Sequence, residues 1–498
     1  MTTEQQKKPD GVTLIRDLSD SSGYWGSTYT LTPMTDVHVI CDAPLGCFNL
    51  LGTACVDYTD SIPHIENLTP TAITETDVTV HGTAGITLKA VQGVEREITH
   101  GLKQIIVVST AESEQIGSDH TDMLAKHAPG TRFYYSASLE EDEWQGRDRA
   151  LKWLWAEFGA PGTLVAPTPG TVNIIGPTYG CFNAGADLHE LKRLVQGAGG
   201  TINLIYPYQS LLRDTPRLAE AAVNIVLHKE YGSGLCADLG RPWLAAPFGI
   251  QDTTAFITRL GDLLGTHAQA EAFLAEEKRT TLQPVWDLWR GPQGDWLGSM
   301  AVGIVAGRGY ADGLRRYLGD ELGMPIAFCA GRPAMPGEPD NLAVREIIHK
   351  GAPPVLFGSV NEQIYLAEAE TRGTNFIAAA NPGAFVRRAL GTPFVGYSGT
   401  VWILQEIVNG FYNTLAGFLP VETERSKRQA AQEGPAGRYA WSPEASLLLQ
   451  RAVDQAPYVA RISASRELRL AVEQLAKARD LKAIGPDLVT EALGTLTR

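Results

Sequence analysis

Cysteine thiolates bind soft metal ions and act as nucleophiles, and Cys47 lies where a protein presents such a group. Residues 36–40 alternate polar and β-branched side chains, which predicts a short buried strand. The following Ala43-Pro-Leu-Gly ends this strand, because proline cannot extend a strand ladder and glycine permits a tight turn. Cys47 is therefore predicted to follow the carboxyl end of a strand, where α/β sheets bind their ligands.

Two more cysteines, Cys41 and Cys55, flank Cys47 in the sequence. Their spacing, Cys41-x5-Cys47-x7-Cys55, lacks the closely paired ligands that zinc favours. It is compatible with one or more thiolates bound to an iron–sulfur cluster, whose ligands can come from distant segments and from another chain. The alternative is that all three are small buried hydrophobic residues, which the local spacing alone favours.

Other residues near Cys47 in the sequence could act on a bound ligand. Asp57, Tyr58 and His64 follow the third cysteine in a predicted loop, where they could donate protons or orient a ligand, or simply face solvent. Upstream, Tyr24 and Trp25 could line a site for a flat ligand, although ordinary packing also uses such a pair.

The composition is that of an ordinary soluble globular protein, with 44% hydrophobic and 20% charged residues. The net charge of −14 argues against nucleic-acid binding, which needs a basic face. Six cysteines in 498 residues are too few for a disulfide scaffold. We find no signal peptide and no apolar run long enough to span a membrane, and therefore expect a cytoplasmic protein.

Strand and helix patterns alternate through most of the chain and are interrupted by glycine- and proline-rich stretches, of which residues 159–170 are the clearest. This predicts an α/β protein made of three doubly wound, Rossmann-like units with a helical appendix at the C-terminus. The expected segments are a flexible leader (1–22), a unit carrying the cysteines (23–160), two further α/β units (171–298 and 299–420), a connector (421–440) and the appendix (441–498).

Within the first unit, residues 101–110 are predicted to form a buried strand that ends in small polar residues. Residues 111–122 follow its carboxyl end, which is a natural place for a functional loop. The chain contains no G-x-x-x-x-G-K-[ST], H-E-x-x-H, C-x-x-C or G-x-S-x-G motif. Its ten histidines are scattered, so nucleotide hydrolysis through a Walker loop and a histidine-rich metal site are not indicated.

Several stretches, taken in order along the chain, resemble the Z-subunit family of chlorophyllide a reductase, within the nitrogenase-like superfamily. They are Gly23-Tyr-Trp-Gly, Ala43-Pro-Leu-Gly-Cys47, Val172-Asn-Ile-Ile-Gly-Pro-Thr-Tyr-Gly, Trp286-Asp-Leu-Trp-Arg, Val355-Leu-Phe-Gly-Ser-Val-Asn-Glu, Thr392-Pro-Phe-Val-Gly-Tyr-Ser-Gly and Ala460-Arg-Ile-Ser-Ala-Ser-Arg-Glu-Leu-Arg. The resemblance extends over about residues 23–480, nearly the whole chain.

The resemblance implies a two-component reductase that converts a chlorin into a bacteriochlorin by reducing the C7=C8 double bond of ring B of chlorophyllide a. A separate homodimeric iron–sulfur protein hydrolyses ATP and delivers the electrons, which agrees with the missing Walker loop. This subunit is expected to pair with a homologous Y subunit in a heterotetramer. A 4Fe-4S cluster between the two subunits would relay the electrons to the substrate.

The resemblance also assigns roles to residues. Cys47 matches the family's cluster ligand from this subunit, and cysteines of the Y chain would supply the others. The equivalent subunit of the dark protochlorophyllide reductase has aspartate there, so the cysteine favours the chlorophyllide enzyme. Cys41 and Cys55 lie outside this ligand motif. Tyr24 and Trp25 become candidates for stacking on the macrocycle, whereas the proton donor is not assigned by the resemblance.

Other functions fit parts of the same sequence. A nitrogenase-like reductase for an organosulfur compound or a nickel tetrapyrrole precursor would share the superfamily. A non-catalytic scaffold for metal-cluster assembly would release its cluster to an acceptor protein, whereas a reductase would retain it through turnover. A stand-alone α/β binding protein for a small ligand is a further alternative.

Overall fold

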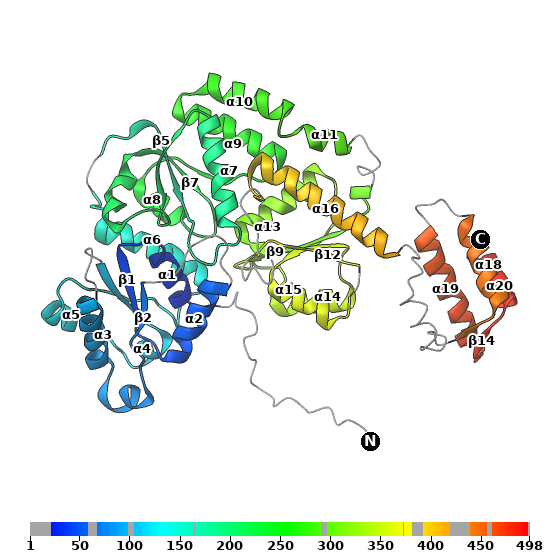
Figure 1. Ribbon diagram of the computed structural model, residues 1–498, viewed down its shortest axis with the longest axis horizontal. Coiled ribbons are helices and arrows are strands. Elements are labelled where there is room, and N and C mark those ends of the chain that lie inside the picture. The colour runs from blue at the N-terminus through cyan, green and yellow to red at the C-terminus, as the bar shows by residue number, and fades with distance from the viewer. Residues whose placement is uncertain are drawn as a thin grey trace. The chain divides into compact units, whose positions relative to one another are not determined.

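Three four-stranded parallel sheets follow one another along the chain, and all three have the same strand order (Figure 1). The computed structural model describes residues 21–57, 67–97, 104–162, 165–289, 296–371, 373–380, 392–418, 439–455 and 461–496. The chain divides into two units, residues 1–417 and 418–498, and the first contains the three sheets.

The first sheet has the order β2-β1-β3-β4, with strands β1 (Val37–Cys41), β2 (Leu68–Pro70), β3 (Gln104–Val108) and β4 (Arg132–Tyr134). The second has the order β6-β5-β7-β8, with strands β5 (Thr168–Ile175), β6 (Thr201–Tyr206), β7 (Ala221–Val226) and β8 (Trp243–Ala245). The third has the order β10-β9-β11-β12, with strands β9 (Val302–Gly307), β10 (Ile326–Arg332), β11 (Val355–Gly358) and β12 (Asn375–Ala378).

Each sheet therefore has a topological switch point between its two central strands, where the chain turns to opposite sides of the sheet. These neighbours are β1 and β3, β5 and β7, and β9 and β11, and each pair is parallel. In doubly wound sheets, ligands bind beyond the carboxyl ends of the strands at this point. The predicted fold class, parallel α/β units followed by a helical segment, is confirmed.

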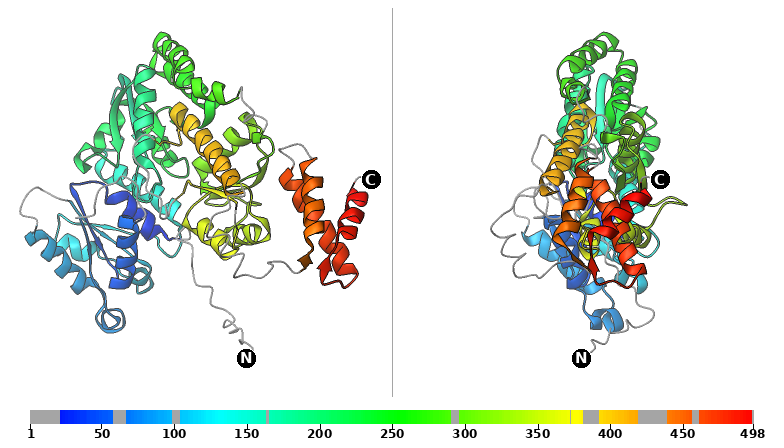
Figure 2. Two further views of the ribbon diagram at one scale, coloured as in Figure 1. Left: turned by 45° about the vertical axis from the view of Figure 1, so that its right-hand side comes forward. Right: turned by 90° about the vertical axis from the view of Figure 1, so that its right-hand side faces the viewer.

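Helices pack against the sheets from both sides (Figure 2). In the first unit they are α1 (Gly23–Leu31), α2 (Leu45–Asp57), α3 (Ala84–Glu97), α4 (Ala111–Gln115), α5 (Thr121–His127), α6 (Glu143–Phe158), α7 (Ala184–Gly197), α8 (Ser233–Leu239), α9 (Gly249–Leu264), α10 (His267–Arg279), α11 (Gln283–Trp289), α13 (Arg308–Arg315), α14 (Asn341–Gly351), α15 (Val360–Glu368) and α16 (Gly396–Phe418). The other helical segments described are a 3-10 helix (Leu212–Glu220) and two π-helical segments (Asp77–His81 and Arg316–Glu321).

The glycine-rich stretch at residues 23–26 is helix α1, which the sequence pattern did not reveal. Helix α1 packs closely on α6: a Cβ atom at Gly26 would overlap the carbonyl oxygen of Glu143, and one at Gly146 would overlap the backbone of Gly23. These glycines therefore permit backbone contact between the two helices. Helix α6 begins at Glu143, where Asp142 and Gln145 form a capping box.

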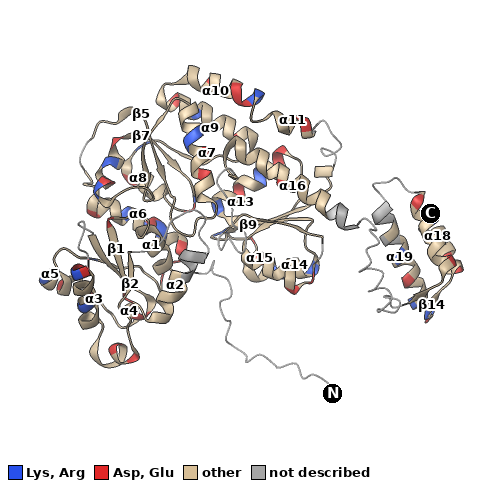
Figure 3. Cartoon of the chain, viewed as in Figure 1, with Lys and Arg blue, Asp and Glu red and all other residues tan. Residues whose placement is uncertain are grey.

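Charged side chains of both signs are interspersed on the helices (Figure 3). No helix in the described part of the chain is both long and apolar enough to cross a membrane. Of the predicted leader, only residues 21 and 22 are described, and of the predicted connector only residues 439 and 440.

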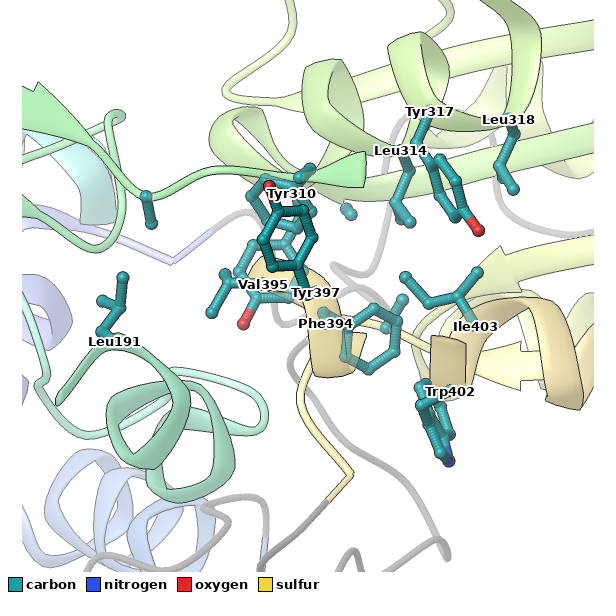
Figure 4. Packing of buried hydrophobic residues seen from close by; sticks show 14 of the residues in the cluster. Leu191, Tyr310, Leu314, Tyr317, Leu318, Phe394, Val395, Tyr397, Trp402 and Ile403 are labelled. Atoms are coloured by element: carbon teal, nitrogen blue, oxygen red, sulfur yellow. The ribbon is translucent and has the colours of Figure 1, made fainter. Parts of the chain in front are cut away.

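The apolar core is continuous between neighbouring sheets. Alternate side chains of β5 face different clusters, with Val172 and Ile174 in one and Ile175 in the other, so both faces of this sheet are buried. Helix α16 joins the core of the second and third sheets through Trp402, whose ring lies 4.9 Å from that of Phe394 (Figure 4). The segment before α16 thereby ties the two sheets together.

The second unit contains α18 (Pro443–Asp454), α19 (Arg461–Ala478), α20 (Pro486–Leu496) and a short parallel pair, β13 (Ala440–Trp441) with β14 (Ala483–Ile484). Ser442 caps α18, where its side chain accepts a hydrogen bond from the backbone N–H of Ala445, and proline follows at the first helical position. The three helices enclose their own apolar cluster.

Candidate functional site

Cys47 lies at the switch point of the first sheet, in the first turn of α2 just after β1. Its Sγ lies 3.0 Å from Oε1 of Glu112, which belongs to α4 after β3. The segment expected as a loop at residues 111–122 begins instead with helix α4, since Thr110 caps it. It meets the Cys47 turn because the carboxyl ends of parallel strands share one edge of the sheet. The structure thus pairs a thiol with a carboxylate.

The surroundings of Cys47 favour the neutral thiol in the isolated chain. Partial burial disfavours the thiolate, and the nearby Glu112 carboxylate repels it, so the pKa of Cys47 is raised to about 12. A metal ion bound by this sulfur must displace the proton. The Cys47 thiol is therefore expected to react slowly until a metal ion displaces its proton.

A buried polar network fixes the backbone beside Cys47. The Asp42 carboxylate is fully buried and accepts hydrogen bonds from the hydroxyls of Thr71 (3.1 Å) and Thr87 (2.9 Å). Nε2 of His120 lies 2.9 Å from the same carboxylate. The hydroxyl of Thr110 donates to the carbonyl oxygen of Asp42 at 2.7 Å, which joins the ends of β1 and β3. This network holds the turn that presents Cys47.

The two flanking cysteines are placed differently. Cys41 is fully buried in β1, and burial raises the pKa of its thiol to about 12. The backbone of Cys55 lies in α2, but its side chain falls outside the described part. Among the described residues, no group of three or more histidine, cysteine, aspartate or glutamate side chains is arranged to hold a metal ion. Cys47 is thus a single donor.

The remaining predicted site residues are distributed around α1 and α2. Tyr24 is buried in the core with 3% of its surface exposed, and Trp25 is half-buried. Asp57 ends α2 instead of lying in a loop, and its side chain is not described. Tyr58 and His64 lie outside the described residues.

A second polar group lies at the switch point of the second sheet. Cys181 follows β5, His228 follows β7, and both line a small cavity of about 40 Å³. The cavity is bounded by the carboxyl ends of strands from the second and third sheets and by the start of α6. It is therefore enclosed by parts of all three α/β units.

Residues 22–412 match the model of a protein family described as "Nitrogenase component 1 type Oxidoreductase". The chain belongs to this family. The match covers the three sheets and most of α16, and it makes the chain part of an oxidoreductase family.

Curated relatives of this nitrogenase component 1 type chain are distant. Over 319 residues it is 28% identical to the B subunit of light-independent protochlorophyllide reductase from Chloroflexus aggregans, covering 59% of this chain and 55% of the relative. Over 419 residues it is 26% identical to the B subunit of the same enzyme from Nephroselmis olivacea, covering 76% of each. The chain thus spans only slightly more than half the length of the Chloroflexus relative.

A solved structure supports the family's fold. The structure "Nitrogenase Cp1 at pH 6.5" aligns with a TM-score of 0.67 at 16% identity, covering 84% of this chain and 97% of that one. At this identity the similarity concerns the fold alone. The nitrogenase-like α/β fold is therefore shared.

In this family member, the sequence did not reveal the group around Cys181. Its signal was present: Cys181 follows a strand and Gly176-Pro-Thr-Tyr-Gly, much as Cys47 follows a strand and Ala43-Pro-Leu-Gly. The partner His228 comes 47 positions later in the sequence, so only the sheet brings the two side chains together.

Proposed function

We propose that this chain belongs to the catalytic component of chlorophyllide a reductase, which reduces the C7=C8 double bond of ring B. Membership of the nitrogenase component 1 type family supports a reductase. The ordered stretches that resemble Z subunits, such as Thr392-Pro-Phe-Val-Gly-Tyr-Ser-Gly, support the substrate. A homologous Y-like subunit would complete a heterotetramer, and a separate ATP-hydrolysing iron–sulfur protein would supply the electrons.

The observation that carries this proposal is the partial exposure of Cys47 at a sheet switch point, next to exposed apolar residues. On the same turn and helix, Leu45 and Leu50 are 55% and 63% exposed. Exposed apolar side chains of this size are typical of a protein interface. A thiol in such a surface can serve a metal group shared with a second chain.

These residues fit a shared iron–sulfur cluster in which this chain supplies one ligand. The Cys47 thiolate is a soft donor suited to iron, and the described residues offer no complete ligand set of their own. The other ligands would then belong to the partner. When bound, the cluster would relay single electrons to the tetrapyrrole.

The chain's own residues would prepare Cys47 for this role. Sγ must lose its proton to bind iron, and the Glu112 oxygen 3.0 Å away is placed to accept it. The Asp42 network keeps the turn in place while this happens. For the substrate, we propose Asp57, Tyr58 or His64 as proton donor.

Stacking on the macrocycle would fall to Trp25, because it is less buried than Tyr24. An aromatic ring can cover a flat tetrapyrrole and exclude water from it.

A second candidate is a role in light-independent protochlorophyllide reductase. It is favoured by the names of the curated relatives. In that enzyme the resemblance places aspartate at the position of Cys47, so the two candidates differ in the ligand as well as in the substrate.

The test is anaerobic co-purification of the chain with its Y-like partner, as wild type, Cys47→Ala and Cys329→Ser. Cys329 is also half-buried but lies in β10 of the third sheet, so it is the matched control. Iron content and the reduced-state EPR signal are measured first. Turnover with the ATPase component and ATP is then measured on chlorophyllide a and on protochlorophyllide.

We expect about four irons per heterodimer in wild type and in Cys329→Ser, and loss of signal and turnover in Cys47→Ala. Absence of iron from co-expressed wild type would refute the ligand assignment. Normal iron with turnover of protochlorophyllide alone would refute the substrate and favour the second candidate.

A further inference from the structure

The switch points of the first and second sheets carry equivalent residues. After β1 and β3 the structure places Cys47 and Glu112, and after β5 and β7 it places Cys181 and His228. The first cysteine therefore lies beside a carboxylate, which can be negative, and the second beside an imidazole, which can be positive. This exchange reverses the electrostatic environment of the sulfur.

Two hydroxyl groups and one cation lie near the Cys181 sulfur, and one of the hydroxyls, that of Tyr231, donates its proton to the carbonyl oxygen of Gly176. Sγ lies 2.7 Å from the hydroxyl of Tyr231, 3.2 Å from that of Thr178 and 4.0 Å from Nη1 of Arg147. Burial alone would raise the pKa of this thiol, but the charges of His228 and Arg147 outweigh burial and lower the pKa to about 6. These charges therefore favour the thiolate at Cys181 more than at an ordinary buried cysteine.

His228 is held as a cation beside this sulfur. Its ring stacks between those of Tyr231 and Tyr310, at centroid distances of 5.5 and 5.6 Å. Nδ1 lies 3.6 Å from Oε1 of Glu230. Burial lowers the pKa of His228, but Cys181 and Glu230 raise it more, to about 10.

His228 also has spare hydrogen-bonding capacity toward the cavity. Its Nε2 atom is buried and has no hydrogen-bond partner in the described part of the chain. Because His228 lines the cavity together with Cys181, a small polar molecule there would meet both the sulfur and a proton donor.

Small molecules have room to reach this position. A cavity of about 40 Å³ exceeds the roughly 10–15 Å³ that one water needs, so hydrogen peroxide fits as well. Trp144 and Arg332 line both the cavity and a surface groove of about 460 Å³. Asn341 also lines both, so the two cavities are neighbours.

We propose that Cys181 is a second reactive cysteine of this chain, which hydrogen peroxide oxidises to a sulfenic acid in the cavity it shares with His228. The thiolate sulfur attacks one peroxide oxygen, so an S–O bond forms and the O–O bond breaks. The leaving hydroxide takes the proton of the His228 imidazolium and departs as water. Sulfur loses two electrons and peroxide gains them.

Oxidation would also change the charge of the group. The sulfenic acid carries no full negative charge and His228 has given up its proton, so both charges of the pair disappear and Arg147 keeps Glu143 as its counter-ion. The site would thus respond to oxidants independently of Cys47 and of any cluster that Cys47 holds.

The chain supplies its own controls for a test. Cys41 and Cys236 are as buried as Cys181, but burial raises the pKa of each thiol to about 12. The full-length protein is purified anaerobically and treated with brief pulses of hydrogen peroxide in the presence of dimedone. Mass spectrometry then gives the labelling rate of each cysteine.

We expect Cys181 to be labelled at least about 100-fold faster than Cys236, because the attacking species is the thiolate. Equal rates for the two cysteines would overturn the proposal. So would Cys181 labelling that rises with urea in step with unfolding, since it would show reaction of the opened chain only.

A variant pair tests the role of the imidazolium. His228→Gln should slow labelling of Cys181 by at least about 10-fold, because it removes the cation and the proton donor. The control is His189→Gln, since His189 is exposed on α7 and should leave the rate unchanged. An unchanged rate in a folded His228→Gln variant would overturn the role of His228. The comparison of Cys181 with Cys236 in the wild-type protein tests the reactivity of Cys181 without any variant.

Discussion

Nη2 of Arg147 lies 2.5 Å from Oε1 of Glu143, one turn earlier on α6, and both side chains are buried. Arg147 also donates to the carbonyl oxygen of Tyr179 at 2.6 Å. Helix α6 is therefore bonded to the turn after β5 that carries Cys181. The buried pair fixes how the two sheets meet.

Removing one partner of this pair should be costly. Arg147→Met leaves the Glu143 carboxylate buried without its counter-ion, so we expect a loss of about 3–5 kcal/mol in unfolding free energy. Arg279→Met is the control, because Arg279 and Glu276 form a pair that is 74% and 51% exposed and is worth at most about 1 kcal/mol. Thermal unfolding of both variants measures the difference, and similar shifts in the two would contradict it.

Two glycine substitutions, one at the contact between α1 and α6 and one at an uncrowded helix position, should have opposite effects on stability. Gly26→Ala should destabilise the protein by about 1–3 kcal/mol, because its Cβ would overlap the Glu143 carbonyl oxygen. Gly93→Ala in α3 should stabilise by about 0.5–1 kcal/mol, since no atom lies within 4 Å of the added Cβ. Denaturation midpoints of the two variants should move in opposite directions, and a shared direction would refute the packing argument.

Local patterns were sufficient to predict the sheets and the place of Cys47. Alternating residues before a proline–glycine turn specify where a strand ends. The carboxyl end of a parallel strand is where α/β sheets bind their ligands. Helix α1 was missed because its glycines, Gly23 and Gly26, oppose helix formation locally. They are retained by contact with α6, a helix more than 100 positions away in the sequence.

The group around Cys181 depends on contacts that no local pattern contains. Its thiolate needs Arg147 from α6 and His228 from the end of β7, and the His228 ring is covered by Tyr310 from α13. Three segments must come together before the pKa of this thiol differs from that of an ordinary buried cysteine. The sequence predicted a strand end before Cys47 and the family resemblance implied its ligand role, but neither gave a reason to separate Cys181 from Cys236.

Asp187 predicts a pH dependence of stability. It is fully buried in α7, where one oxygen accepts hydrogen bonds from the backbone N–H groups of Phe394 (2.6 Å) and Val395 (3.2 Å). Burial raises its pKa, against the effect of those bonds, to about 7. The folded state therefore binds this proton more tightly than the unfolded state does.

The stability owed to protonated Asp187 is present below about pH 4 and is lost as the pH rises toward 7, by up to about 1.4 kcal/mol per unit. Asp187→Asn cannot ionise, so its melting temperature should rise relative to wild type between pH 4 and 7 and change no further above pH 7. Melting curves across this range measure the difference. Parallel curves for the two proteins would contradict the assignment.

The network at Asp42 predicts a link between stability and access to Cys47. Asp42→Ala removes the acceptor of the buried Thr71 hydroxyl, and a loss of this kind costs about 1–3 kcal/mol. It also removes one of the two acceptors of the Thr87 hydroxyl, which keeps its bond to the carbonyl oxygen of Thr83. Because Asp42 follows β1 directly and lies five residues before Cys47, the turn should also open more often, and alkylation of Cys47 should become faster. Mass spectrometry of the alkylated cysteines and thermal unfolding measure the two effects.

The control for this link is Asp77→Ala, at a partly exposed residue whose carboxylate accepts hydrogen bonds from Thr74. It should leave both the melting temperature and the alkylation rate of Cys47 nearly unchanged. If Asp42→Ala lowers the melting temperature but Cys47 reacts no faster, the network stabilises the sheet without controlling the turn. Because the network joins the ends of β1 and β3 through Thr110, we expect the two effects to appear together.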